Sequence, residues 1–382
     1  MSGSLSILII CKSLPWRFNG GIQTHVWDLS RTLITKGHKV TVLTGGAWKN
    51  RPKSFLKEGV EIVEIPFFPG RRLPFFSSLI EEFAFNFSAR NWVKVNHAKF
   101  DIIHAQGRSG YLLYSVRPIQ KKLVQTIHGL TDKEANASNT LNIDAKSHSF
   151  FARKWESKLL EATRATIVVS SDLRSAISKS NESIRVIPNG VKKLHSGFNS
   201  KEIKSNKRFV FVGRLSPIKG LVPLIKAIGK SKADLFLDII GDGPQRAEIQ
   251  TLISKFNLQN NVRLLGQRSN EEVRRSLSYY QALVLPSFFE TQGIVLLEAN
   301  YQEIPVIASD LPAIRESVTH MTNGLLCDSY NPSSFVEAMI RLRDDNSLAQ
   351  RMGQAGKTIV EQNFSWDRIG DETLKVYYKI AG

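Results

Sequence analysis

Short apolar runs alternate with longer amphipathic stretches along the first half of the chain. The runs typical of buried strands cover residues 5–11, 39–44, 60–65, 102–104, 123–127, 166–169 and 184–187. Between the first two, residues 21–36 place Ile22, Val26, Leu29 and Leu33 at helical spacing. Strands that are apolar throughout and are separated by helices predict a parallel sheet covered on both faces.

The same pattern restarts near residue 208. It predicts strands at residues 208–212, 235–240, 262–265, 282–285, 306–308 and 324–327, with helices at 221–230 and 245–256. Two such series predict an α/β protein with two doubly wound, Rossmann-like domains, residues 1–187 and 208–365, that face each other across a cleft. The polar, aperiodic segments 188–207 and 136–148 are interpreted as an interdomain linker and a mobile loop.

Composition and cysteine usage narrow the class of protein. Of 382 residues, 42% are hydrophobic and 23% are charged, which excludes global disorder. No apolar run approaches the roughly 18–20 residues that span a bilayer. Residues 5–11 lack a preceding basic segment and are too few for a signal peptide. Cys11 and Cys327 are too few for a disulfide framework or a cysteine zinc site, so a reducing cytoplasm fits.

The charge of the chain is unusual and uneven. The 52 basic and 34 acidic residues give a net charge of +18. Residues 1–190 hold 27 basic and 14 acidic side chains, a net +13, and the remainder holds 25 and 20, a net +5. This asymmetry suggests that the first half faces a polyanion, such as anionic lipid, nucleic acid or a phosphorylated substrate. A surface that is basic only for solubility is the alternative.

Polar and glycine residues follow predicted strands of the first domain at the edge where open parallel sheets bind ligands. Gly20 and Gly21 separate the first strand from the first helix; they could bring backbone N–H groups to a phosphate or form only a turn. His128 ends the strand at residues 123–127 and could hydrogen-bond a sugar, shuttle a proton or be structural. His104, at the end of the strand predicted at residues 102–104, has the same functional and structural alternatives, but a functional role is less strongly indicated.

Cations and glycines occupy corresponding positions in the second domain. Gly213 and Arg214 follow one predicted strand, and Lys219 comes five residues later. A guanidinium and an ammonium there could offset the charge of a diphosphate without a metal, or could be two solvated cations. Gly241 ends the next strand in a tight-turn sequence without the third glycine of a dinucleotide fingerprint, which disfavours an NAD enzyme.

Two glutamates are the most informative pair in the sequence. Glu290 comes just after a predicted strand, and Glu298 lies within a helix predicted to begin near Gly293. A loop carboxylate can accept hydrogen bonds from sugar hydroxyls, and one about a turn and a half into the helix can bind both hydroxyls of a ribose. The backbone N–H groups of Gly293, Ile294 and Val295 could hold a phosphate.

Aromatic and basic residues are interleaved over residues 66–99. The set comprises Phe67, Phe68, Phe75, Phe76, Phe83, Phe85, Phe87 and Trp92 with Arg71, Arg72, Arg90, Lys94 and Lys99. Such a composition is typical of a helix that docks on a membrane surface, or of core residues in a large helix with a basic outer edge. Single-stranded nucleic acid also binds to aromatics and cations, but no recognised nucleic-acid-binding motif is present.

These features, in this order, resemble the retaining GT-B glycosyltransferases of the large family 4 type. The resemblance spans nearly the whole chain. Its motifs are Gly20-Gly21 with His25, His128-Gly129, residues 187–191 (Ile-Pro-Asn-Gly-Val), residues 212–215 (Val-Gly-Arg-Leu) with Lys219-Gly220, residues 241–244 (Gly-Asp-Gly-Pro), Leu265-Gly266, Pro286-Ser287, Glu290 with Glu298, residues 305–308, residues 323–326 and residues 364–366 (Phe-Ser-Trp).

The resemblance implies a role for each matching position. Arg214 and Lys219 would hold the diphosphate of a nucleotide-sugar donor, and Glu298 would bind the nucleotide ribose. Glu290 would contact the donor sugar, and His128 would lie beside it. The family pattern therefore implies a glycosyltransferase that uses a nucleotide sugar as its co-substrate, with no metal and no other cofactor.

The resemblance also implies an activity and a place in the cell. The enzyme would move a hexose-type sugar from a UDP- or GDP-linked donor to a hydroxyl of a glycan or lipid-linked acceptor, with retention, in cell-envelope polysaccharide or glycolipid synthesis. Gly21 would approach the phosphates or the acceptor, and the final helix, residues 366–382, would cross back to the first domain. The basic first half adds the expectation of a cytoplasmic enzyme that binds an anionic inner membrane surface.

The chain departs from the family pattern at three places. Gln292 precedes Gly293 where the family often has phenylalanine, Glu303 stands where glycine is usual, and residues 311–313 (Leu-Pro-Ala) replace a common Gly-Gly. The four residues expected to carry catalysis are intact. A GT-B-like nucleotide-sugar epimerase and a basic nucleic-acid-binding protein are the alternatives; the latter leaves the strand-end glutamates unexplained.

Overall fold

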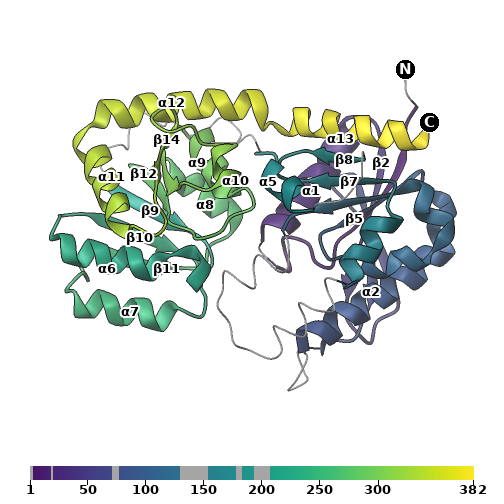
Figure 1. Cartoon of the computed structure of the whole chain (residues 1–382). Coiled ribbons are helices and arrows are strands. Elements are labelled where there is room, and N and C mark those ends of the chain that lie inside the picture. Colours follow the sequence, from purple (N-terminus) through teal and green to yellow (C-terminus); the bar gives the residue numbers. More distant parts are fainter. Residues whose placement is uncertain (1–2, 19, 71–76, 130–153, 178–182, 193–206) are drawn as a thin grey trace. The chain divides into compact units, whose positions relative to one another are not determined.

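The computed structural model in Figure 1 describes residues 3–18, 20–70, 77–129, 154–177, 183–192 and 207–382. These residues form two compact units. Unit 1 comprises the described residues up to Gly190 together with Trp366–Gly382, and unit 2 comprises those from Val191 to Ser365. The predicted mobile loop, residues 136–148, and residues 193–206 of the predicted linker lie outside the described residues.

Unit 1 is built on an eight-stranded sheet in the order β3-β4-β2-β1-β5-β6-β7-β8. Its strands are β1 Ser6–Ile10, β2 Lys39–Gly46, β3 Lys53–Lys57, β4 Val60–Pro66, β5 Ile102–Gln106, β6 Leu123–Ile127, β7 Ala165–Val168 and β8 Ile184–Val186. Seven of them correspond to the predicted apolar runs and pair in parallel. The hydrophobic pattern missed β3, which pairs antiparallel with β4 and exposes most of its side chains.

Helices cover both faces of this sheet. The helices of unit 1 are α1 Gly21–Thr35, α2 Ser77–Asn96, α5 Ser171–Ala176 and α13 Trp366–Ala381. Alternate side chains of a strand point to opposite faces. Accordingly, Ile7 and Ile9 pack in one core with α1 and α13, whereas Leu8 and Ile10 pack in another with α2. This double coverage is why β1 is apolar and buried at each position from Ile7 to Ile10.

Unit 2 has a wholly parallel six-stranded sheet in the order β11-β10-β9-β12-β13-β14. Its strands are β9 Arg208–Val212, β10 Phe236–Ile240, β11 Val262–Gly266, β12 Ala282–Leu285, β13 Val306–Ser309 and β14 Gly324–Cys327. Its helices are α6 Leu221–Ser231, α7 Arg246–Lys255, α8 Asn270–Leu277, α9 Ile294–Tyr301, α10 Pro312–Arg315, α11 Pro332–Asp344 and α12 Asn346–Asn363. Within them, α6 contacts α7 and α11, and α9 contacts α8 and α12. The prediction of two doubly wound α/β domains is confirmed.

Each sheet has one place where the strand order reverses. In unit 2 the chain runs from β9 outward through β10 to β11, then returns to the other side of β9 with β12. In unit 1 the corresponding strands are β1 and β5. Loops that follow two such neighbouring strands diverge to opposite faces and leave a crevice at the carboxyl edge, where doubly wound sheets bind ligands. A ligand-binding site is therefore expected at these two crevices.

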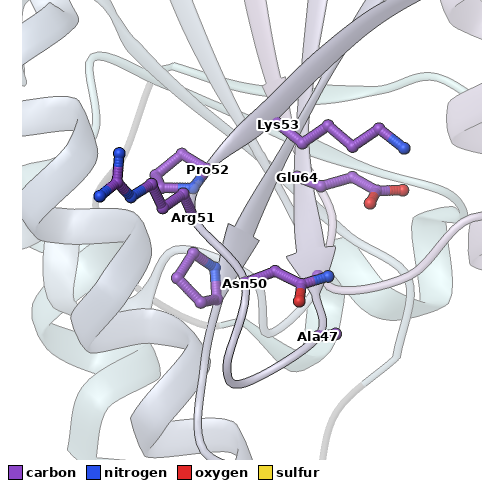
Figure 2. A pocket seen from close by; sticks show the side chains of 8 residues that line it. Ala47, Asn50, Arg51, Pro52, Lys53 and Glu64 are labelled. Atoms are coloured by element: carbon purple, nitrogen blue, oxygen red, sulfur yellow. The ribbon is translucent and has the colours of Figure 1, made fainter.

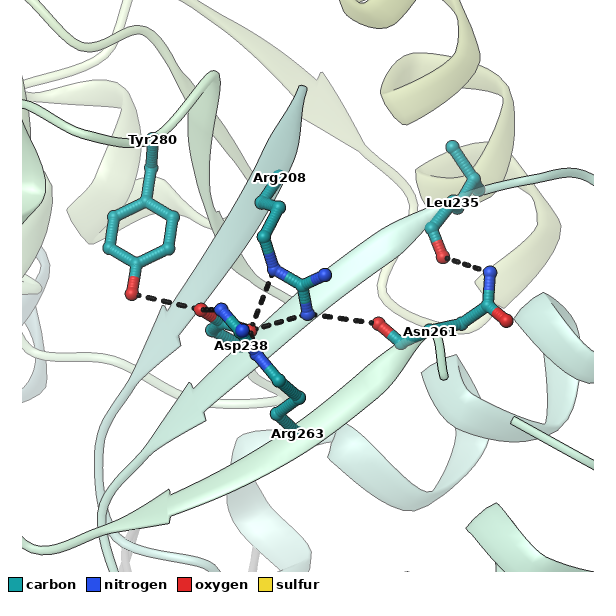
Figure 3. A network of polar contacts seen from close by, with 6 residues as sticks. All are labelled: Arg208, Leu235, Asp238, Asn261, Arg263 and Tyr280. Carbon is teal, nitrogen blue, oxygen red and sulfur yellow. Dashed lines mark hydrogen bonds and ion pairs between the residues drawn. The ribbon is translucent and has the colours of Figure 1, made fainter. Parts of the chain in front are cut away.

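A buried carboxylate ties three strands of unit 2 together (Figure 3). Asp238, in β10, accepts hydrogen bonds from Arg208 of β9 and Arg263 of β11, at 2.9 and 2.7 Å between each Nε and Oδ1. The Tyr280 hydroxyl donates to Oδ2 at 3.1 Å. The Asp238 side chain is only 1% exposed, so this network fixes the strands whose opposite ends carry the candidate loops.

Candidate functional site

Two loops meet at the strand-order reversal of unit 2. The first follows β9 and carries Lys219, and the second follows β12 and carries Glu290. Lys219 Nζ lies 2.5 Å from Glu290 Oε1, and the Ser287 hydroxyl donates to the same oxygen at 2.8 Å. The backbone N–H of Phe288 donates to the Ile218 carbonyl at 2.8 Å, which joins the loops directly. The structure thus brings together two predicted residues that are 71 positions apart.

Glycine is required where these loops pack most closely. Gly220 has a φ of +68°, and a Cβ there would lie 2.0 Å from the Pro286 carbonyl oxygen at the end of β12. Gly241 has a φ of +142°, and its Cβ would lie 1.9 Å from the Gly213 carbonyl oxygen. Because neither position has room for a side chain, the predicted glycines hold the β9 loop against its two neighbours.

Two further predicted residues of unit 2 lie in the β9 loop and in helix α9. Arg214 lies in the β9 loop with its side chain exposed. Glu298, in α9, forms an ion pair with Arg274 of α8, at 3.4 Å between Oε1 and Nη1. Both of these side chains are mostly buried. Arg274 could not be recognised from the sequence, because α8 has the residue pattern of an ordinary surface helix.

Helix α9 directs its amino end toward the same loop. Gly293 precedes it with a φ of +70°, a left-handed conformation that favours glycine. As the N-cap residue, Gly293 has no side chain with which to cap this end of the helix. The N–H groups of Ile294 and Val295 belong to the first turn, where an α-helix offers them no carbonyl partner. Together with the helix dipole, they make this end a binding place for an anion.

In unit 1, His128 lies just beyond the carboxyl end of β6 and is held by Gln106 at the end of β5. The distance from His128 Nε2 to Gln106 Oε1 is 2.8 Å. The His25 ring of α1 packs edge-on against His128, with 4.8 Å between ring centroids, and also contacts Trp366 of α13. His104 is fully buried in β5 and is hydrogen-bonded to Tyr377 and Thr126. Gln106, Thr126 and Tyr377 carried no signal in the sequence analysis.

Burial keeps these three histidines neutral. It lowers the pKa of His104 to about 3 and that of His25 to about 4, although the neighbouring Asn189 side chain opposes the latter shift. Burial also holds the pKa of His128 well below its usual value, and the neighbouring His25 and His104 lower it further. At pH 7 each ring therefore has one N–H and one lone pair.

The first helix begins beside this histidine. Gly21 is the first residue of α1, and Gly20 precedes it in an extended conformation. A Cβ on Gly107, just after β5, would lie 3.5 Å from Ile22 and 4.0 Å from His128. The start of α1, the end of β5 and the end of β6 therefore meet at the strand-order reversal of unit 1. Gly21 and His128, predicted separately, belong to one locality.

A pocket of about 310 Å³ opens at the carboxyl ends of β2 and β4 (Figure 2). Its lining comprises Gly46, Ala47, Asn50, Arg51, Pro52, Lys53, Glu64 and Pro66. Glu64 is paired with Arg17 of the loop after β1, at 2.8 Å between Oε1 and Nη2. The exposed Arg51 and Lys53 thus give the pocket an excess of positive charge. None of the residues that line it belongs to a motif recognised in the sequence.

The aromatic residues of the stretch 66–99 divide between core and surface. Phe85 of α2 is fully buried. Phe83 and Phe87 are 44% and 49% exposed, and their rings stack with 6.2 Å between centroids. Arg71, Arg72, Phe75 and Phe76 lie outside the described residues. Among the described helices, none is both long and apolar enough to cross a membrane.

Two family models match consecutive parts of the chain. Residues 19–193 match the model described as Glycosyltransferase Family 4, and residues 196–359 match the model described as Glycosyl transferases group 1. An uncharacterised glycosyltransferase of Methanocaldococcus jannaschii is 26% identical, over 99% of this chain and 98% of its own.

Solved structures resemble the whole fold. Sucrose-phosphate synthase from Thermosynechococcus elongatus has a TM-score of 0.77 at 22% identity, covering 98% of this chain and 99% of that one. HepE of Anabaena, in complex with UDP and glucose, has a TM-score of 0.72 at 20% identity, covering 97% and 98%. The two-domain arrangement of strands and helices is that of the GT-B glycosyltransferases.

Proposed function

The chain belongs to the group 1 glycosyltransferases, and we propose that it is a retaining, metal-independent hexosyltransferase. It would move a hexose-type sugar from a UDP- or GDP-linked donor to a hydroxyl of a glycan or lipid-linked acceptor. The nucleotide sugar is a co-substrate, and no other cofactor is proposed. The HepE complex with UDP and glucose supports this class of donor.

The contact between Lys219 and Glu290 is the observation that carries the proposal. It unites a cation for the donor phosphates with a carboxylate for the donor sugar at the crevice of a doubly wound sheet. An ammonium has three N–H donors, so Lys219 can keep Glu290 and still donate to a phosphate. The contacts from Lys219 and Ser287 both use Oε1, which leaves Oε2 to accept a hydrogen bond from a sugar hydroxyl.

The proposed chemistry follows from where charge develops. When the bond to the anomeric carbon breaks, negative charge accumulates on the departing diphosphate. Lys219, Arg214 and the amino end of α9 would stabilise this charge without reorganising. Glu298 would bind the ribose from the same helix. The acceptor hydroxyl would attack from the side on which the diphosphate leaves, which retains the anomeric configuration.

The acceptor is proposed to bind at the carboxyl edge of unit 1. His128, the amino end of α1 and the pocket beside β2 all lie at this edge. Arg51 and Lys53 at the pocket, and the net charge of +13 over residues 1–190, favour an acceptor that carries anionic groups. Cell-envelope glycans and glycolipids have this chemistry.

An anionic membrane surface is proposed as a further partner of unit 1. The exposed rings of Phe83 and Phe87 share the outer side of α2 with Lys94. Aromatic side chains that insert between headgroups, next to cations that attract them, are what an interfacial helix needs. The protein would then act in the cytoplasm, peripherally on the inner face of the plasma membrane.

Donor binding and turnover test the proposed function. A thermal-shift panel of UDP-, GDP- and ADP-sugars identifies the donor, because a ligand that binds the native protein raises its Tm. With that donor, we expect Lys219→Ala and Arg214→Ala each to lower kcat by about 10²–10³-fold, the scale for losing one preorganised group that stabilises charge. Lys226→Ala, an exposed lysine on α6, is the matched control and should turn over normally.

Release of nucleoside diphosphate distinguishes a glycosyltransferase from a nucleotide-sugar epimerase, the alternative activity. A transferase releases UDP or GDP in proportion to acceptor, whereas an epimerase needs no acceptor. Undiminished turnover in both Lys219→Ala and Arg214→Ala would contradict the electrostatic mechanism. Acceptor-independent conversion of the donor would contradict the transferase itself.

A further inference from the structure

Buried hydrogen bonds connect the C-terminal helix to His128. The Tyr377 hydroxyl of α13 lies 2.5 Å from His104 Nδ1, and the Thr126 hydroxyl of β6 lies 2.6 Å from His104 Nε2. The side-chain nitrogen of Gln106 lies 3.2 Å from His104 Nε2 and 3.4 Å from Nδ1. The carbonyl oxygen of the same amide faces His128 Nε2 at 2.8 Å.

His104 determines which way the Gln106 amide points. Both of its ring nitrogens are already engaged by hydroxyl groups, so the ring has no further N–H to donate. A carbonyl oxygen turned toward this ring would find no donor, whereas the amide N–H groups can donate to a neutral, electron-rich imidazole. Gln106 therefore keeps its nitrogen toward His104 and its oxygen toward His128.

The Gln106 oxygen in turn determines the protonation of His128. A carbonyl oxygen can only accept, so the proton of the His128 ring must be on Nε2. The ring is neutral at pH 7, because burial, with the His25 ring of α1 packed edge-on against it, lowers its pKa well below the usual value. Nδ1 then carries a lone pair. His128 can accept a hydrogen bond from a substrate hydroxyl at Nδ1, but it cannot donate one there.

We propose that Gln106 is a positioning residue, which holds the ring of His128 in the Nε2–H tautomer so that Nδ1 meets a substrate hydroxyl as an acceptor. The support of Gln106 by His104, Thr126 and Tyr377 is part of the same arrangement. Its effect on catalysis rests on the proposed function. The tautomer itself does not, because it can be measured in the protein without substrate.

Nuclear magnetic resonance of the histidine ring nitrogens tests the tautomer. In the full chain labelled with ¹⁵N-histidine, His128 should be neutral at pH 7 and carry its proton on Nε2. Gln106→Glu keeps an acceptor oxygen facing Nε2 but adds a negative charge, which raises the pKa of His128. His128 should then titrate at a higher pH than in the unsubstituted protein. A proton on Nδ1 in the unsubstituted protein would overturn the proposal, whatever the enzyme transfers.

Kinetics test whether this arrangement serves catalysis. Gln106→Met keeps the length of the side chain but removes the amide, and we expect kcat to fall about a hundredfold, the scale for a misplaced catalytic group. The donor KM should stay within about twofold, since His128 is not proposed to bind the nucleotide. In Gln106→Glu, kcat should be retained at high pH and fall as His128 becomes protonated and loses its lone pair.

Gln125→Met is the matched control. Gln125 is fully buried in β6, and the described part of the chain offers its side chain no hydrogen bond. Its replacement should leave kcat and the His128 tautomer unchanged, and a thermal melt of each variant verifies folding. An unchanged kcat in folded Gln106→Met would refute the positioning role even if His128 has the expected tautomer. If the substitution prevents folding, the pH profile of Gln106→Glu decides the same question.

Discussion

Loss of the Asp238 carboxylate should destabilise unit 2 strongly. In Asp238→Ala, the half-exposed Arg263 can turn to water. Arg208, whose side chain is 9% exposed, keeps a buried charge without a carboxylate; among the described residues it retains the Asn261 carbonyl at 3.2 Å and the face of the Phe236 ring. Breaking a buried pair from one side leaves an uncompensated charge, which costs about 4 kcal/mol. The strands affected, β9 and β10, are those that carry the Lys219 and Gly241 loops.

The assay must report on the unfolding of unit 2 alone, and tryptophan fluorescence does not. All six lie outside residues 191–365, so their fluorescence follows unit 1. Hydrogen exchange of peptides from β9 and β10, followed by mass spectrometry, measures the opening of unit 2. A loss of about 4 kcal/mol corresponds to exchange roughly a thousandfold faster. Asp310→Ala is the control, because Asp310 forms a similar two-point pair with Arg315, but at the surface.

Acidification should also reveal the contribution of the Asp238 carboxylate to the stability of unit 2. Burial of Asp238 opposes its ionisation, but hydrogen bonds from Arg263 and Arg208 outweigh this and hold its pKa below the usual value. A lowered pKa stabilises the native state above the unfolded pKa of about 3.9, and this contribution is lost as the pH falls through the native pKa. The protection factor of unit 2 amides, the intrinsic exchange rate divided by the observed rate at the same pH, should therefore be steady from pH 7 to 5 and fall below 4, more than in Asp238→Ala. A cost in Asp238→Ala no larger than in Asp310→Ala would refute the reasoning.

Two further substitutions probe the loops and the surface. In Gly266→Ala, the new Cβ has no atom within 4 Å, so the variant should lose about 1 kcal/mol of stability, only because of its φ of +72°. In Gly241→Ala, the Cβ also clashes with the backbone, so the Tm of this variant should fall well below that of Gly266→Ala. Phe83→Ser combined with Phe87→Ser should abolish flotation with phosphatidylglycerol-containing vesicles at low salt, whereas Leu56→Ser, on the exposed strand β3, should not. Equal flotation of all variants would argue against the α2 surface.

The sheets could be predicted from the sequence because their strands are buried on both faces. Such strands are apolar at nearly every position, and their limits in the structure lie within two residues of the predicted ones. β3 escaped because it is an edge strand in which Phe55 and Leu56 are the only apolar residues. The burial that makes a strand recognisable is thus the property that β3 lacks.

The partners within the site could not be predicted, because they depend on the order of strands. Lys219 and Glu290 each had a recognisable position after a strand, but only the adjacency of β9 and β12 brings them together. Gln106 meets His128 because β5 and β6 are neighbours. Tyr377 reaches His104 because the chain returns to unit 1 with its last helix. Each residue type is common in such positions, so the local sequence gave no signal for these contacts.

Two of the three departures from the family pattern, at Glu303 and at residues 311–313, are accommodated by their local surroundings. Glu303 has a φ of +58°, which explains why glycine is usual there, and Lys357 of α12 holds its carboxylate at 2.8 Å. Gly353 of the same helix lies so close to the Glu303 backbone that a Cβ would be 2.0 Å from its carbonyl oxygen. Pro312 occupies the first turn of α10, where its missing N–H costs no hydrogen bond. Compensation at these positions explains how the chain can depart from the pattern and keep the contact between Lys219 and Glu290.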